Sequence, residues 1–146
     1  MVIIIKLTRI TDLRYDNDLT QRELSNILNV KRSAYSKWEC GINEFPLIII
    51  IKLSLFFDVS VDYLANLSNI RGKANKDVSI DNINKKITAF RKERNITQKE
   101  ISTYLKITQK TYSDYELGKY KVPTSMAINI AKFHNISLEE LLSKQC

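Results

Sequence analysis

The chain has 146 residues, enough for one domain or for two small ones. Its apolar fraction of 44% excludes a disordered chain, and its formal net charge of +7 favours a polyanionic partner such as nucleic acid. Two cysteines, Cys40 and Cys146, are too few for a disulfide framework and suggest a reducing compartment. No apolar run is long enough to span a bilayer, and residues 1–6 lack the features of a signal peptide, so we expect a cytoplasmic protein.

Residues 2–5 (VIII) come first along the chain and suit a short strand or an apolar arm. The rest of the chain is organised by an internal repeat. At an offset of 77 residues, and without a gap, residues 14–64 align with residues 91–141. Identical pairs in this register include Arg14/Arg91, Gln21/Gln98, Glu23/Glu100, Ser25/Ser102, Tyr35/Tyr112, Glu39/Glu116, Gly41/Gly118 and Pro46/Pro123. The sequence therefore predicts two homologous domains.

The predicted boundaries follow from this repeat. The first domain covers residues 1–67, with 1–6 as the possible arm or strand, and the second covers residues 80–146. Residues 68–79 (SNIRGKANKDVS) are polar and basic and contain a glycine, which is typical of a linker. Fully extended, this linker would reach about 40 Å.

Each copy carries the same signals for five helices. Thr20-x-x-Glu23 and its counterpart Thr97-x-x-Glu100 form capping boxes that open the second helix. A break of three or four residues leads to a third helix, which ends before a glycine suited to a C-terminal cap. Pro46 suits the first turn of the fourth helix. The predicted fold is all-α, with two tandem five-helix domains.

The two segments LTQRELSNILNVKRSAYSKWECGINEFP and ITQKEISTYLKITQKTYSDYELGKYKVP resemble the helix-turn-helix of lambda-repressor-like proteins (Cro/repressor type, XRE family). The resemblance implies a recognition helix over residues 31–39 in the first copy and 108–116 in the second. It also implies structural ion pairs Arg14–Glu39 and Arg91–Glu116.

Both copies depart from the family at the turn between the two motif helices, where the usual glycine is Asn29 or Lys106. Asparagine tolerates the left-handed conformation well, whereas lysine adopts it at a cost of about 1 kcal/mol or more. The left-handed turn is therefore expected to be less favourable in the second copy than in the first. The aromatic residues of the recognition helices have inward spacing and are expected in the core; they are Tyr35, Trp38, Tyr112 and Tyr115.

Outward positions on the recognition helices are the candidate DNA contacts. Arginine or lysine suits guanine, and glutamine suits adenine, so we expect the first copy to be guanine-directed through Arg32 and the two copies to read different half-sites. The resemblance assigns a phosphate contact to the glutamine that opens each second helix. The assigned DNA-binding residues are Gln21, Lys31, Arg32, Ser33, Lys37, Gln98, Thr108, Gln109, Lys110, Asp114, Lys119 and Lys121.

The positive charge is unevenly distributed between the copies. Residues 1–70 are neutral overall, so residues 71–146 carry the whole excess of seven charges. The loop after the recognition helix is INEF in the first copy and KYKV in the second. The first copy is thus equipped for base contacts and the second, through Lys119 and Lys121, for attraction to phosphates.

Catalysis is not expected, because no nucleophile motif, phosphate loop or metal-ligand spacing is present, and we expect neither a cofactor nor a metal. We assign the single histidine, His134, a surface or packing role. The alternative to a DNA-binding repressor is a protein-interaction or dimerisation module in which one or both copies have lost DNA binding. The apolar run 47–51 supports this alternative, since Leu47 or Ile48 would pack on another domain or on a second subunit of a homodimer. Neither a small-molecule ligand nor a membrane contact is evident.

Overall fold

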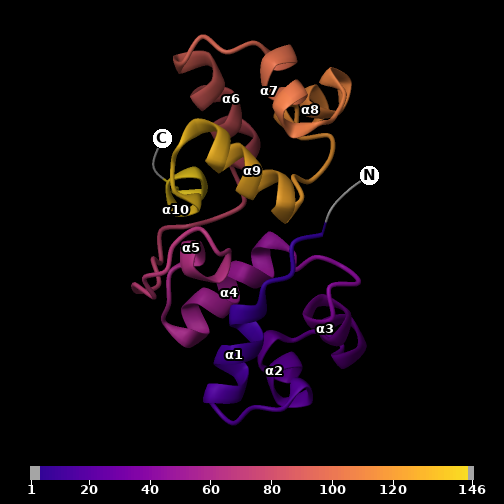
Figure 1. Ribbon diagram of the computed structural model, residues 1–146, viewed down its shortest axis with the longest axis vertical. Coiled ribbons are helices and arrows are strands. Elements are labelled where there is room, and N and C mark those ends of the chain that lie inside the picture. The colour runs from indigo at the N-terminus through magenta and orange to yellow at the C-terminus, as the bar shows by residue number, and fades with distance from the viewer. Residues whose placement is uncertain (1–3, 145–146) are drawn as a thin grey trace. The chain divides into compact units, whose positions relative to one another are not determined.

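The computed structural model describes residues 4–144 and confirms the predicted all-α fold. Ten helices and one isolated antiparallel bridge, between Val78 and Ser143, make up the regular structure of these residues. The chain divides into two compact units between Lys76 and Asp77, each with five helices (Figure 1). Across residues 4–144 every helix is too short or too polar to cross a membrane.

The two units repeat the same helices. The helices of the first unit are α1 (Thr8–Asp16), α2 (Gln21–Leu28), α3 (Arg32–Glu39), α4 (Leu47–Phe57) and α5 (Val61–Leu64). Those of the second are α6 (Ile83–Glu93), α7 (Gln98–Leu105), α8 (Gln109–Glu116), α9 (Thr124–His134) and α10 (Leu138–Leu142). From α2 to α4 both ends of each helix lie at the repeat offset from those of α7 to α9, so the repeat in sequence is a repeat in structure.

Local signals set most of these boundaries. The Thr20 hydroxyl accepts the backbone N–H of Glu23 at 3.1 Å, and the Glu23 side chain returns to Thr20, which completes the capping box. Ser60 and Ser137 cap α5 and α10 in the same way. The prediction for Pro46 was off by one position: its ψ of 147° makes it the N-cap, and the helix begins at Leu47. An extended N-cap still accommodates proline, because the missing N–H is not needed there.

Left-handed backbone conformations end several helices at equivalent positions in the two units. Asn29 has φ of 57° and Lys106 has φ of 59°, so the departure from glycine leaves the turn intact in both copies. Gly41 and Gly118 follow α3 and α8 with φ of 78° and 76°, a region in which any other residue would be strained. The two domains therefore share their turn geometry even where the residue types differ.

The core of each unit lies among its five helices. In the first, α1 packs on α3 and α5, and α2 packs on α3 and α4; in the second, α6 packs on α8 and α10, and α7 packs on α8 and α9. Helix α4 buries residues around most of its circumference, Leu47 among them, whereas Ile48 is 41% exposed. This arrangement leaves α3 and α8 packed by one face and open to solvent on the other.

Two of the segments outside the helices are the start of the chain and the connection between the two repeats. Ile4 to Leu7 form neither helix nor strand, while residues 1–3 of the expected arm, like Cys146, lie outside the described residues. The expected linker is not a free tether. Its first residues are bound to the first unit, where the Ser60 N–H donates to the Arg71 carbonyl at 2.7 Å. Its last residues belong to the second unit, since the Ser79 N–H donates to the Leu142 carbonyl at 2.8 Å.

Candidate nucleic-acid interface

Helices α2 and α3, with α7 and α8 as their counterparts, form a helix-turn-helix in each unit (Figure 1). The turn closes when the Val30 N–H donates to the Ser25 carbonyl at 2.9 Å, and Ile107 makes the same bond to Ser102 at 3.1 Å. Both serines are buried between the motif helices, with 2% and 3% of their surface exposed. Small side chains at this position allow the two helices to approach closely.

A buried ion pair anchors the recognition helix of the first domain. The guanidinium of Arg14 on α1 donates to Glu39 at the end of α3, with Nε to Oε1 at 2.7 Å and Nη2 to Oε2 at 3.1 Å. Its Nη1 donates to the Leu19 carbonyl at 2.8 Å. Glu39 also accepts the Tyr35 hydroxyl at 2.6 Å and the Gln21 side-chain amide at 2.9 Å. One carboxylate therefore ties α1, α2 and α3 together.

The second domain repeats this cluster with one bond fewer. Arg91 donates to Glu116 at 2.6 and 3.1 Å, and Gln98 donates to the same carboxylate at 3.0 Å. The Tyr112 hydroxyl is buried, but it makes no hydrogen bond to any described residue. The Arg91 side chain is 13% exposed, compared with 7% for Arg14. The structure thus brings both arginine–glutamate pairs together, and the first is the more completely bonded.

The charges of these pairs are stabilised by each other. Burial alone would raise the pKa of Glu39, but the hydrogen bonds from Arg14, Tyr35 and Gln21 outweigh burial and lower that pKa below its ordinary value. The pKa of Glu116 is also lowered, because hydrogen bonds from Arg91 and Gln98 outweigh the effect of burial. Burial and the bond to Glu39 raise the pKa of Tyr35, so this phenol stays a hydrogen-bond donor.

The aromatic residues of the recognition helices line the core, as expected for three of the four. Tyr35 and Tyr112 are 0% exposed and Tyr115 is 9% exposed. Trp38 is half-buried and packs against Phe45, with ring centroids 5.7 Å apart. The inward face of each recognition helix is therefore occupied by packing, and only the opposite face is available to a ligand.

The outward face of α3 is basic and uncovered. All four base-contact candidates assigned to it are exposed; they are Lys31, Arg32, Ser33 and Lys37. Lys31 is the N-cap residue, and its side chain makes no capping bond to the backbone N–H groups in the first turn of α3. Unpaired N–H groups at a helix N-terminus attract anions such as phosphate.

The outward face of α8 differs at two assigned positions. The Thr108 hydroxyl accepts the Thr111 N–H at 3.1 Å and caps the helix, so it is already committed within the protein. The expectation that Asp114 points outward is wrong, because this residue is 7% exposed. Its carboxylate lies 3.4 Å from Lys110 Nζ and 3.9 Å from Lys119 Nζ, and the backbone and these longer side chains shield it. Gln109 and Lys110 remain exposed.

The loops after the recognition helices keep the predicted contrast. Lys119 and Lys121 are both exposed beside α8, and Tyr120 between them is 64% exposed. The loop of the first domain presents Ile42 instead, which is 62% exposed. A basic loop with an exposed aromatic ring suits contact with a phosphate backbone better than an apolar loop does.

Two features of this interface were missed by reasoning from sequence. Gln21 and Gln98 were assigned to phosphate, but each is also a structural partner of the buried glutamate, with its amide oriented by that bond. Tyr120 was not assigned at all. The repeat alignment held the signal for the glutamines, because Gln and Glu recur together at an unchanged separation of 18 residues.

The comparisons with known proteins agree with this geometry. The model of the helix-turn-helix family matches the chain twice, over residues 10–64 and 87–141. This chain belongs to the XRE-type helix-turn-helix family. Members of that family are DNA-binding regulators of transcription. The two matches coincide with the two repeats, so each domain is a family member by itself.

A curated relative matches about half of the chain. Over 72 residues, 49% of this chain, the sequence is 33% identical to the uncharacterized HTH-type transcriptional regulator YqaE of Bacillus subtilis (strain 168). The matched stretch spans 58% of that protein. No solved structure matches the chain significantly. Among residues 4–144 no group of acidic, histidine or cysteine side chains is arranged to hold a metal ion.

Proposed function

We propose that this protein is a transcriptional regulator that binds specific sequences in double-stranded DNA and acts as a repressor. In this proposal α3 and α8 enter the major groove, and the two domains contribute unequally. The first reads bases, with Arg32 directed at guanine, and the second supplies mainly phosphate contacts. Repression is favoured over activation because occluding a promoter requires no further surface.

The observation that carries the proposal is the exposed basic face of α3 on a rigidly anchored helix. Lys31, Arg32 and Lys37 are exposed together, while Glu39 at the end of the same helix is locked to α1 and α2. A recognition helix must be held rigidly to present side chains to base edges, and the buried carboxylate supplies that anchor.

Replacement of Arg32 by alanine is expected to weaken binding to the selected DNA site by about 5- to 150-fold, the range of one lost base contact of 1–3 kcal/mol. The site is first obtained by selection of bound sequences from random duplex DNA with the full chain. Affinities of the variant for the selected duplex and for a scrambled duplex are then measured by fluorescence anisotropy. Because a base contact carries specificity, the affinity for the scrambled duplex should fall much less than the affinity for the selected duplex.

The control for this experiment is Lys52→Ala, which removes an exposed cation from α4, outside the helix-turn-helix. It should lower both affinities slightly and equally. An Arg32→Ala protein that retains its preference for the selected duplex would contradict the assignment. Identical half-sites in the selected sequences would contradict the unequal roles of the two domains.

Replacement of both Lys119 and Lys121 by alanine is expected to reduce the slope of log affinity against log salt concentration by about 2. Each lysine that neutralises a phosphate releases condensed counterions and contributes about 0.9 to that slope on duplex DNA. The measurement is DNA affinity at several salt concentrations. Lys92→Ala with Lys132→Ala removes two exposed cations from α6 and α9 and should leave the slope nearly unchanged. An unaltered slope in the loop variant would refute the phosphate role.

A second candidate function is favoured by the apolar surface of α4. Ile48, Leu55 and Phe56 on this helix are between 41% and 45% exposed, which suits contact with a protein partner or a homodimer. Under this alternative, neither the full chain nor its recognition-helix variants would prefer any DNA sequence. The selection experiment therefore separates the two functions.

A further inference from the structure

In the first domain, the chain that follows α5 binds back across α1 and α5. The Arg9 guanidinium on α1 donates to the Tyr63 carbonyl at 2.7 Å, to the Ser68 carbonyl and to Asn69 Oδ1 at 2.7 Å. The guanidinium of Arg71 lies 3.7 Å from the carboxylate of Asp16, at the far end of α1. Residues 68–71 thus form a bent segment that is bound to α1 at both ends. Its oxygen atoms accept hydrogen bonds from Arg9, and its Arg71 side chain pairs with Asp16.

Further contacts hold this segment along its length. The Ser60 N–H donates to the Arg71 carbonyl, and the Asp58 carboxylate accepts the Ala74 N–H at 3.2 Å. Gly72 passes so close to Ser60 that a Cβ atom there would lie 3.3 Å from the serine Cβ. Arg9 also stacks over the Tyr63 ring, with its guanidinium carbon 4.3 Å from the centroid. The surface of α1 and α5 therefore binds this segment of the chain in the first domain.

The second domain has a groove at the equivalent place. By the repeat offset, the three residues that hold the segment in the first domain, Arg9, Asp16 and Tyr63, correspond to Lys86, Glu93 and Glu140. All three of these equivalents line one hollow between α6 and α10, with a volume of about 620 Å³. The same hollow is also lined by Lys85, Ala89, Phe90 and Lys144. Its size falls within the range of ligand-binding clefts.

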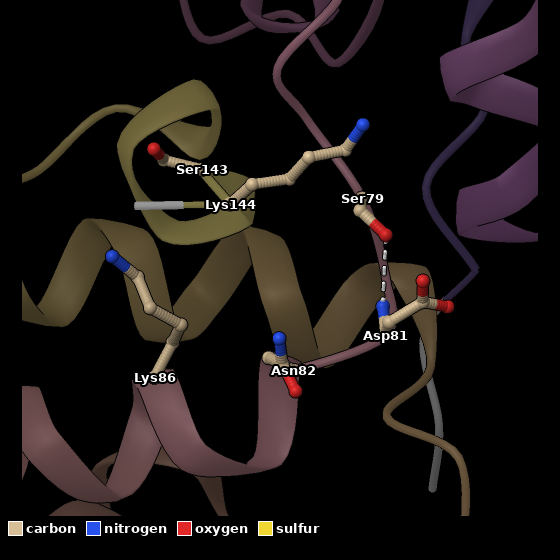
Figure 2. A pocket seen from close by; sticks show the side chains of 6 residues that line it. All are labelled: Ser79, Asp81, Asn82, Lys86, Ser143 and Lys144. Carbon is tan, nitrogen blue, oxygen red and sulfur yellow. Dashed lines mark hydrogen bonds between the residues drawn. The ribbon is translucent and has the colours of Figure 1, made fainter. Parts of the chain in front are cut away.

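The hollow continues toward the start of the domain. A smaller cavity has a volume of about 210 Å³. Figure 2 shows the side chains that line it, among them Asn82 at the N-cap of α6, Lys86 on α6, and Ser143 and Lys144 in the chain that follows α10. The two cavities share these four residues, so they form one groove.

At two of the three equivalent positions the charge in this groove has the same sign as in the first domain. Lys86 is the counterpart of Arg9, which binds carbonyl and amide oxygens, and Glu93 is the counterpart of Asp16, which binds Arg71. Glu140 adds a second carboxylate in place of Tyr63, and Phe90 supplies the aromatic surface. A ligand for this groove needs an acceptor at one end and a cation at the other.

We propose that the groove between α6 and α10 is a docking site for a peptide segment of a partner protein. The segment carries an acceptor side chain, Asn or Asp, two positions before an Arg or Lys, as Asn69 precedes Arg71 in the first domain. The acceptor meets Lys86, and the basic residue meets Glu93. This site is separate from the DNA-binding face, and its existence does not depend on DNA binding.

The test uses a fluorescein-labelled peptide, LSNIRGKA, which copies residues 67–74, titrated against the full chain and followed by anisotropy. Saturable binding is expected at peptide concentrations up to about 1 mM. Glu93→Arg should weaken it about fivefold or more through charge repulsion. A peptide with the change Arg71→Glu should bind the unaltered chain as weakly as the original peptide binds the Glu93→Arg chain. The changed peptide and the Glu93→Arg chain together should show the original affinity again. Recovery of this kind requires direct contact between the two positions.

The matched control is Asp16→Arg in the first domain. There the chain's own segment remains tethered through Arg9 at a high effective concentration, so this change should leave peptide binding intact. Equal losses for Asp16→Arg and Glu93→Arg would overturn the proposal, because the peptide would then be binding the first domain. Absence of saturable binding, or affinity insensitive to the charge of the peptide, would overturn it as well.

Discussion

Replacement of Glu39 by alanine is expected to destabilise the first domain by about 3–5 kcal/mol, because it leaves the Arg14 guanidinium buried without its carboxylate. Tyr35 loses its acceptor at the same time. A small domain has only about 5 kcal/mol of stability or little more, so this variant should be close to unfolded at room temperature. The protein offers a selective probe: its single tryptophan, Trp38, lies in α3, so fluorescence during urea unfolding reports the first domain.

Two further variants separate the buried charge from other causes. Arg14→Met combined with Glu39→Met removes both charges and should destabilise the domain less than Glu39→Ala alone. Glu116→Ala, the matched change in the second domain, should cost about 1 kcal/mol less than Glu39→Ala, since the Tyr112 hydroxyl makes no bond that is lost. Glu116→Ala should leave the urea midpoint of the Trp38 fluorescence change unaltered, because Trp38 reports the first domain. In far-ultraviolet circular dichroism, the unfolding of the second domain should move to a lower urea concentration. A double variant as unstable as Glu39→Ala would disprove the stranded-charge explanation.

The second domain is expected to lose about 3 kcal/mol of stability between pH 6.5 and pH 4, because its histidine is buried in the neutral form. His134 is 5% exposed and packs between Phe133 and Phe90, with ring centroids 5.1 and 5.9 Å away. Neither ring nitrogen has a hydrogen-bond partner among residues 4–144. Burial, with a smaller contribution from the nearby positive charge of Arg94, lowers the pKa of His134 to about 4.

Stability falls on acidification because the folded and unfolded states bind the proton at different pH. The unfolded chain takes up a proton near pH 6.5 and the folded domain only near pH 4, so acidification through this window favours unfolding. Below it the loss of stability from the histidine stops, and the carboxylates dominate. The repeat supplies the control, since the equivalent residue in the first domain is Phe57. His134→Phe should abolish the dependence between pH 6.5 and about 5, above the range in which the carboxylates titrate, as measured by urea unfolding. A wild-type transition that is flat across this window would contradict the prediction.

The sequence predicts the candidate interface correctly at positions where the geometry of the helix backbone alone decides whether a side chain is exposed. The exposed side chains of α3 follow from helical spacing, because one face of a short helix must pack and the opposite face cannot. Asp114 occupies the same helical position as the exposed Lys37 and was assigned outward by that rule. It is buried because a short carboxylate stays close to the helix and draws Lys110 and Lys119 toward it. Side-chain length and neighbouring charge, which periodicity ignores, decided that position.

The linker shows a second limit of the same kind. Residues 68–79 have the composition of a free tether, and nothing local distinguishes them from one. Their binding to the first domain depends on Arg9, which lies 59 residues from Ser68 in the chain. The repeat alignment pairs Arg9 with Lys86, but it does not give the hydrogen bonds by which Arg9 holds this segment.

The sequence by itself determined the two-domain repeat, the helix-turn-helix, the capping residues and the arginine–glutamate pairs, because these depend on local signals and on a register of 77 residues that occurs twice. The tertiary structure decided which hydrogen bonds surround each pair, which charged side chains are exposed, and where the chain after α5 lies. Such features depend on contacts between residues distant in the chain, whose geometry is set only when the helices have packed. The groove between α6 and α10 belongs to this second group, because its lining residues come from both ends of the second domain.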